Sequence, residues 1–139
     1  MMQPVTIYTK SWCPYCHSAK DLLVKKGVAF EEIDVSEGGA KQAAMAERAL
    51  KVDARNPTYL DTAGWAHLTQ GNNVDRALQY LRDARLRSPN DGEIRYHLAA
   101  ALARSQRTAE ARTELDAALQ MPRTLQSADD ARKLLASLK

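Results

Sequence analysis

Two cysteines are the residues of this chain whose type and spacing point most directly to chemistry. Cys13 and Cys16 form a C-x-x-C motif, and the 139-residue sequence holds no other cysteine. A single pair this close cannot be the disulfide framework of a small secreted protein, so it indicates thiol–disulfide exchange or metal binding. We expect a redox pair in which Cys13 attacks a disulfide and Cys16 resolves the mixed disulfide.

The residues around the motif predict a strand before it and a helix after it. Residues 5–8 are β-rich, and Pro14 suits the first turn of a helix that ends at residues 25–27. Cys13 then lies at a helix N-terminus, where unpaired N–H groups and the helix dipole favour an anion. Lys10 adds a positive charge nearby. Together these features predict a lowered pKa for the Cys13 thiol.

The fold class expected from the sequence is α/β followed by all-α. Residues 28–35 form a second β-rich run, which should pair in parallel with residues 5–8 because a helix intervenes. A turn at 36–39 and a helix at 40–52 follow. From residue 53 onward, apolar residues recur every three or four positions. Turn residues, among them 71–73, separate five further expected helices, at 57–70, 74–87, 91–104, 108–120 and 126–138.

An internal period runs through this helical part. The pairs Ala49-Leu50, Ala84-Arg85 and Ala118-Leu119 occupy matching places, at two nearly equal intervals along the sequence. A repeat of roughly 35 residues indicates stacked helical hairpins.

Metal binding and haem attachment fit the residues around the motif less well than a redox role does. Residues 13–17 also match C-x-x-C-H, the haem attachment string, but a strand precedes them and no signal peptide is visible. Structural zinc needs four ligands, and His67 and His97 fall on other expected helices. Pro14 disfavours a bridging iron–sulfur cluster. We therefore expect no bound metal, and we expect the histidines to be surface or packing residues.

The segment from Val5 to about Arg48 resembles the first half of a bacterial dithiol glutaredoxin, on the strand, Lys10 and the run Cys-Pro-Tyr-Cys-His. The resemblance implies a partial thioredoxin-like βαβα unit, with Cys13 as the exposed nucleophile. It also implies that Lys10 and Tyr15 neighbour glutathione, which would be a co-substrate, with no cofactor bound. The Thr-Val-Pro segment, β-hairpin and Gly-Gly segment that continue a complete glutaredoxin do not follow Arg48.

The segment from about Ala49 to Gln120 is similar to tetratricopeptide (TPR) repeats, with Pro89 as the proline between repeats. The resemblance implies antiparallel helical hairpins, small residues where backbones approach, and a capping helix at 128–138. These small residues are Gly64, Ala77, Ala84, Ala99, Ala111 and Ala118. Repeats of this family bind a peptide or protein partner in a concave groove, here expected along Asp61, Trp65, Tyr96 and Arg104. For Trp65 and Tyr96, packing in the core is an equal alternative.

One expected helix, at residues 42–52, belongs to both resemblances. The chain then divides into a glutaredoxin-like segment at 1–48 and a helical repeat domain at 49–139, as a natural or engineered fusion would. Three functions stay open: a glutaredoxin-like oxidoreductase whose repeats recruit a client, a protein-binding scaffold with an inactive redox remnant, and an engineered fusion without selected function.

The composition and charge of the chain limit the classes of partner that we expect it to bind. The 20 Lys and Arg and 17 Asp and Glu residues are interspersed, which does not suggest nucleic-acid binding. No run approaches the roughly 18 apolar residues of a membrane span, so we expect a cytoplasmic protein. The expected clients carry disulfides or bound glutathione. Because a two-stranded sheet is too small to be stable alone, it should lean on the first repeat helices or form a homodimer.

Overall fold

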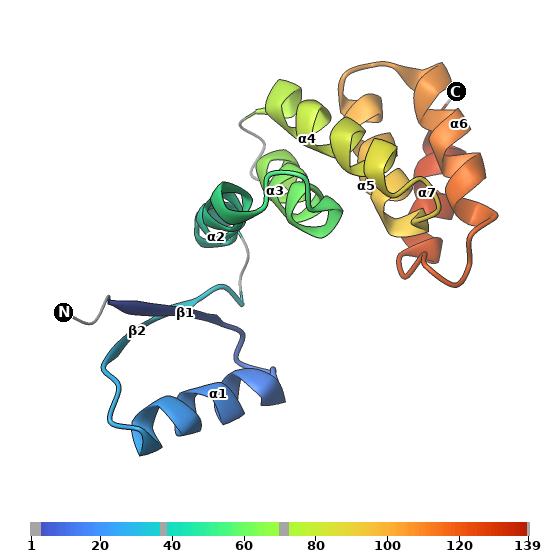
Figure 1. The fold of residues 1–139 in the computed structure, drawn as a ribbon. Helices are drawn as coiled ribbons and strands as arrows, with labels where there is room; N and C mark the ends of the chain where they lie inside the picture. Colours follow the sequence, from blue (N-terminus) through green and yellow to red (C-terminus); the bar gives the residue numbers. More distant parts are fainter. Residues whose placement is uncertain (1–3, 37–38, 70–72, 139) are drawn as a thin grey trace.

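The structure is a computed structural model that describes residues 4–36, 39–69 and 73–138. Residues 37–38 and 70–72, on which two of the expected turns fall, lie outside the described residues. Within the described part, two strands and one helix are followed by a row of helices (Figure 1). No described helix is long and apolar enough to cross a membrane. The predicted order, α/β and then all-α, is confirmed.

The N-terminal unit consists of β1 (Val5–Thr9), α1 (Pro14–Lys25) and β2 (Phe30–Asp34). The strands pair in parallel as predicted, with Ile7 opposite Glu32. After α1, Gly27 has a φ of +66°, which glycine adopts without a Cβ penalty and which turns the chain toward β2. The second strand is shorter than the predicted 28–35, because the Val28 N–H donates back to the Leu23 carbonyl and stays with the helix end.

Six helices make up the rest of the described chain, each within two residues of its predicted bounds. They are α2 (Gly39–Val52), α3 (Pro57–Thr69), α4 (Val74–Arg87), α5 (Gly92–Arg104), α6 (Thr108–Leu119) and α7 (Ala128–Ser137). Side-chain caps define several of their starts. The side-chain carbonyl oxygen of Asn73 accepts from the Arg76 N–H, and the Asp91 carboxylate accepts from the Ile94 N–H. Such caps satisfy the unpaired donors of a first helical turn.

The internal period becomes uniform once it is counted on buried positions. Leu50, Ala84 and Ala118 are all buried and are equally spaced along the sequence. Ala49, the residue matched to Ala84 from the sequence, is only half-buried, so that alignment was wrong by one position. The reason is that a helix packs through one face, and the face is set by the residue that points into the interface.

Small residues allow the helices to approach closely, as predicted. Gly64 is buried, and a Cβ added to it would lie 2.6 Å from the Leu81 Cγ and 3.3 Å from the Ala77 carbonyl oxygen. The alanines at the other five predicted positions are fully buried: Ala77, Ala84, Ala99, Ala111 and Ala118. Among the described residues, the hydrophobic clusters they join are built from the chain from α2 onward and contain no residue of β1, α1 or β2.

The strand pair lies between α1 and α2 (Figure 1) and is less buried than the helical part. No residue of α1 is buried. Tyr8 joins the sheet to α2, because its hydroxyl accepts a hydrogen bond from Arg48 over 2.9 Å. On its other side α2 packs against α3, and Leu50 shares a cluster with Leu60. One helix therefore contacts both parts of the chain, and the expected boundary at residues 48 and 49 falls inside it.

Candidate functional site

Cys13 is the N-cap residue of α1, with an extended backbone (φ −94°, ψ 110°). Its sulfur accepts a hydrogen bond from the Cys16 N–H over 3.3 Å, which satisfies one of the free donors at the helix start. The Cys13 N–H donates to the Lys10 carbonyl over 3.1 Å and holds the turn between strand and helix. Both cysteines are free thiols in this structure and are half-buried. The predicted position of Cys13 at a helix N-terminus is confirmed.

The pKa of the Cys13 thiol is lowered from its ordinary value. The largest cause is a hydrogen bond from the Cys16 thiol, followed by the bond from the Cys16 N–H. A weaker bond from the Tyr15 N–H and the charge of Lys10 act in the same direction, while partial burial opposes them. A lowered pKa raises the fraction of thiolate, the form that attacks disulfides.

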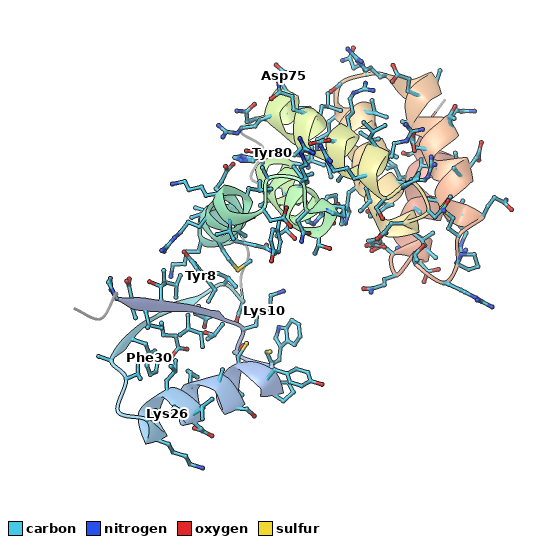
Figure 2. All side chains as sticks on the ribbon, viewed as in Figure 1. Tyr8, Lys10, Lys26, Phe30, Asp75 and Tyr80 are labelled. Carbon is cyan, nitrogen blue, oxygen red and sulfur yellow. The ribbon has the colours of Figure 1, made fainter. Side chains whose placement is uncertain are left out.

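The surroundings of the sulfur are open to solvent. Trp12 and Tyr15, on either side of Cys13 in the sequence, are 71% and 84% exposed. The Lys10 ammonium lies 5.1 Å from the centre of the Trp12 ring, at the sulfur-bearing end of α1 (Figure 2). The structure thus brings Lys10 and Tyr15, the predicted neighbours of glutathione, to the same exposed end of the unit as Cys13.

A second candidate site is a groove of about 430 Å³ between α3, α5 and the C-terminal end of α7. Three of the four residues predicted to bind a partner line it, namely Trp65, Tyr96 and Arg104, and Leu134 and Leu138 close it from α7. The Arg104 guanidinium also donates to the Leu68 carbonyl over 2.5 Å. The groove is mostly apolar, with the Arg104 charge among its lining residues.

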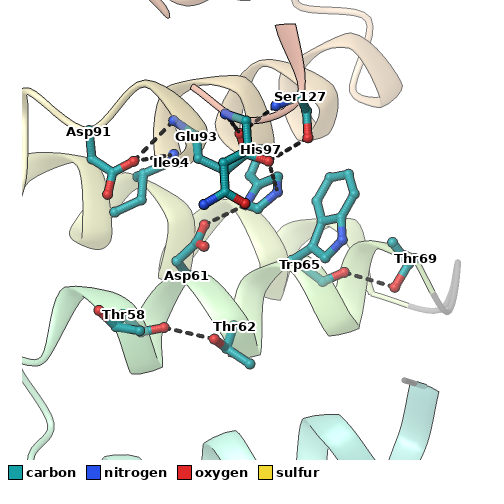
Figure 3. A network of polar contacts seen from close by, with 11 residues as sticks. Thr58, Asp61, Thr62, Trp65, Thr69, Asp91, Glu93, Ile94, His97 and Ser127 are labelled. Carbon is teal, nitrogen blue, oxygen red and sulfur yellow. Dashed lines mark hydrogen bonds and ion pairs between the residues drawn. The ribbon is translucent and has the colours of Figure 1, made fainter. Parts of the chain in front are cut away.

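Asp61, the fourth predicted residue, belongs instead to a polar network beside the groove (Figure 3). Its carboxylate lies 2.7 Å from the Nδ1 of His97, which is buried. The Nε2 of His97 lies 3.5 Å from Glu93, and Glu93 accepts hydrogen bonds from the N–H and hydroxyl of Ser127. This network connects α3, α5 and the start of α7. The His97 ring also stacks on Trp65, with centroids 4.0 Å apart, so Trp65 both packs and lines the groove.

The repeat period of the sequence predicts that His97 is buried, although its residue type alone does not. When the period of the buried positions is carried along the chain, His97 is in register with Ala63 and Ala131, both fully buried. A histidine at a position where the repeat places a small buried residue needs buried partners. A surface or packing role, as expected for His97 from the sequence, is therefore too simple.

A family model described as Tetratricopeptide repeat matches residues 68–138, just over half of the chain. The chain belongs to the tetratricopeptide repeat family. In this tetratricopeptide repeat protein a second model, described as Glutaredoxin, matches residues 5–59 and so covers β1 to α2 and the start of α3. Both predicted resemblances are confirmed, and the two matches are consistent with a fusion.

Several glutaredoxins are similar to the N-terminal part of this tetratricopeptide repeat protein. Glutaredoxin 3 of Escherichia coli (strain K12) is 51% identical over 47 residues, which are 34% of this chain and 57% of that protein. A glutaredoxin of Pseudomonas aeruginosa is 66% identical over 32 residues, 23% of this chain and 38% of that protein. A glutaredoxin of Solanum lycopersicum is 43% identical over 47 residues, 32% of this chain and 44% of that protein. The chain thus spans about half the length of these relatives.

Proposed function

We propose that the chain is a glutaredoxin-like thiol–disulfide oxidoreductase whose tetratricopeptide repeats bind the client protein. The observation that carries the proposal is the half-buried Cys13 sulfur, which caps α1, accepts from the Cys16 N–H, has a lowered pKa and lies between the exposed Trp12 and Tyr15 in the sequence. A nucleophilic thiolate needs this combination of stabilisation and access. The glutaredoxin match over residues 5–59 supports the same chemistry.

The proposed reaction moves two electrons from the dithiol to a client. The Cys13 thiolate attacks one sulfur of a client disulfide, or of a mixed disulfide with glutathione, and the other sulfur leaves and takes a proton. Cys16 then loses its proton and attacks the Cys13 sulfur, and the client or glutathione sulfur still bound to Cys13 leaves as a thiol after taking up a proton. A Cys13–Cys16 disulfide remains. Two molecules of glutathione, as co-substrate, return the electrons and become glutathione disulfide, and Lys10 and Tyr15 are proposed to neighbour it.

Release of glutathione from a small glutathionylated peptide tests this reaction. The reduced chain should release glutathione, and Cys13→Ser should abolish the release. Cys16→Ser should retain the first attack and accumulate a mixed disulfide on Cys13, detected by intact mass spectrometry. A wild-type chain that folds but releases glutathione no faster than Cys13→Ser would refute the proposed activity.

The groove between α3, α5 and α7 is the proposed site for the client peptide or protein. Its apolar lining, which includes Trp65 and Tyr96, offers buried area to an apolar segment, and Arg104 adds a positive charge. A peptide array probed with the chain tests this binding. Trp65→Ala and Arg104→Ala should reduce binding, and Cys13→Ser should leave it intact. Binding without any reduction of the client would favour the alternative, a repeat scaffold with an inactive redox segment.

The proposal also covers location and assembly. A reducing compartment such as the cytoplasm suits it, because the Cys13–Cys16 pair must return to the dithiol state. Neither nucleic acid nor membrane is part of the proposal. A homodimer is part of it, because two strands alone rarely form a stable sheet and β1 and β2 are at best half-buried along most of their length.

A further inference from the structure

The outer edge of β1 carries backbone groups that the described residues leave without a partner. In the part of the chain that the structure describes, the sheet has the order β1-β2, so each strand has a neighbour on one side. The Thr9 carbonyl accepts from the Val35 N–H over 2.8 Å, which shows that Thr9 points its backbone groups toward β2. Because these directions alternate along a strand, Val5 and Ile7 also face β2, whereas Thr6 and Tyr8 face outward.

The two outer edges of the sheet differ in charge. The residues of β1 are Val-Thr-Ile-Tyr-Thr, without a charged side chain. Glu31, Glu32 and Asp34 make three of the five residues of β2 acidic. An edge that pairs with its own copy brings two copies of the same strand side by side, so the acidic side chains of both β2 strands would be crowded together, and like charges on neighbouring strands are destabilising. Self-pairing is therefore disfavoured at the edge of β2 by charge repulsion. At the edge of β1 this repulsion is absent, because β1 carries none of the charged side chains that keep exposed edges from pairing.

We infer that β1 pairs with β1 of a second copy, antiparallel and centred on Ile7. This inference rests on the homodimer proposed above and adds the surface that forms it. Thr6 of one copy then lies opposite Tyr8 of the other, and each such pair exchanges two backbone hydrogen bonds. The result is one continuous sheet of order β2-β1-β1-β2. Ile7 faces its own copy across the twofold axis in a pair without hydrogen bonds, where side chains approach most closely.

The geometry of the β1 faces is compatible with this pairing. Ile7 is on the same face as Glu32, its pairing partner, and Glu32 bonds to Lys20 of α1. Tyr8 is on the opposite face, where its hydroxyl bonds to Arg48 of α2. Neither side chain therefore projects across the outer edge, and the backbone of a second strand can reach Thr6 and Tyr8.

Cross-linking of the full chain tests the predicted register. In a Cys13→Ser, Cys16→Ser background, Ile7→Cys places a cysteine on the twofold axis, where paired Cα atoms lie about 4.5 Å apart, close enough for a disulfide. Mild oxidation should give a covalent dimer on a non-reducing gel. Val5→Cys is the matched control, since Val5 has the same strand, face and half-buried exposure. Two copies of Val5 would lie about 13 Å apart or more, and should not cross-link.

Analytical ultracentrifugation distinguishes a dimer that forms through another surface from a chain that does not dimerise. Thr6→Pro removes an outward N–H but leaves the bonds to β2, and should weaken dimerisation at least about tenfold. Thr6→Val keeps the N–H and should not. A dimer that is insensitive to Thr6→Pro and does not cross-link through Ile7→Cys would overturn the inference and leave the proposed homodimer. A monomer at all concentrations would overturn both.

Discussion

The backbone N–H of Cys16 donates to the Cys13 sulfur over 3.3 Å, across the first turn of α1. This contact stabilises charge on the outer sulfur and also sets the spacing of the pair. A residue three positions into the helix has its N–H directed at the N-cap side chain, which is why a C-x-x-C pair at a helix start activates its first cysteine.

Alkylation of Cys13 by iodoacetamide should therefore persist to lower pH than alkylation of a free cysteine. The pKa of the Cys13 thiol is lowered and so lies below that of a free cysteine, about 8.5. The thiolate is present above this lowered pKa and is lost as the pH falls through it. Cys16→Ala removes the largest cause and should raise the pKa of Cys13. Lys10→Gln should raise it less. A midpoint for the wild-type chain equal to that of free cysteine would contradict the prediction.

The stability contributed by Glu47 should disappear in acid. Burial raises the pKa of this α2 carboxyl, but hydrogen bonds from His67 and Tyr80 and the charge of Arg76 outweigh it, and the pKa is lowered overall. Because the folded-state pKa of Glu47 is lowered, its carboxylate stabilises the fold at any pH above the unfolded-state pKa, which is about 4.3 for Glu. This stability is lost as the pH falls through the folded-state pKa.

Glu47→Gln should accordingly destabilise the chain by about 1 kcal/mol at pH 7, and by much less at pH 3. Urea unfolding at the two pH values measures the difference between Glu47→Gln and the wild type. The loss reports on the docking of α2, because Glu47 contacts both α3 and α4. A destabilisation of equal size at both pH values would show that the charge of Glu47 is not its source.

Gly64→Ala should destabilise the helical part by roughly 1 to 2 kcal/mol in urea unfolding. The added Cβ would lie 2.6 Å from the Leu81 Cγ, and Leu81 is fully buried and cannot swing away. Overpacking of this kind typically costs about 1 to 3 kcal/mol, and the better helix propensity of Ala offsets up to about 1 kcal/mol. In a Leu81→Ala background the same substitution should cost less, and an unchanged cost would argue against the steric origin.

The Asp61–His97 pair should show strong coupling. Removing either side chain leaves the other polar group largely buried without its 2.7 Å partner. We expect Asp61→Ala and His97→Ala each to destabilise by about 2 to 3 kcal/mol. The double variant should lose less than the sum, by about 1 to 3 kcal/mol. Additive losses in the double-mutant cycle would mean that the contact contributes nothing specific.

Several features of the chain were determined by local sequence. Pro14 after a β-rich run, and Gly27 after two lysines, predict both ends of α1, because capping depends on residues within one turn. The position of Cys13 at the start of that helix follows directly. The other helices were also predictable, since apolar spacing and turn residues act over a few positions.

Only the tertiary structure decided which side chains meet across the helices. Asp61 and His97 are 36 residues apart and meet because α3 and α5 pack side by side. Trp65 and Arg104 share a groove for the same reason. The outer edge of β1 is likewise unpaired among residues 4–36, 39–69 and 73–138 because of how these segments pack. A short-range pattern sets the face that a helix or strand presents. Which segment packs against that face depends on residues far apart in the sequence, and a local periodic pattern does not specify them.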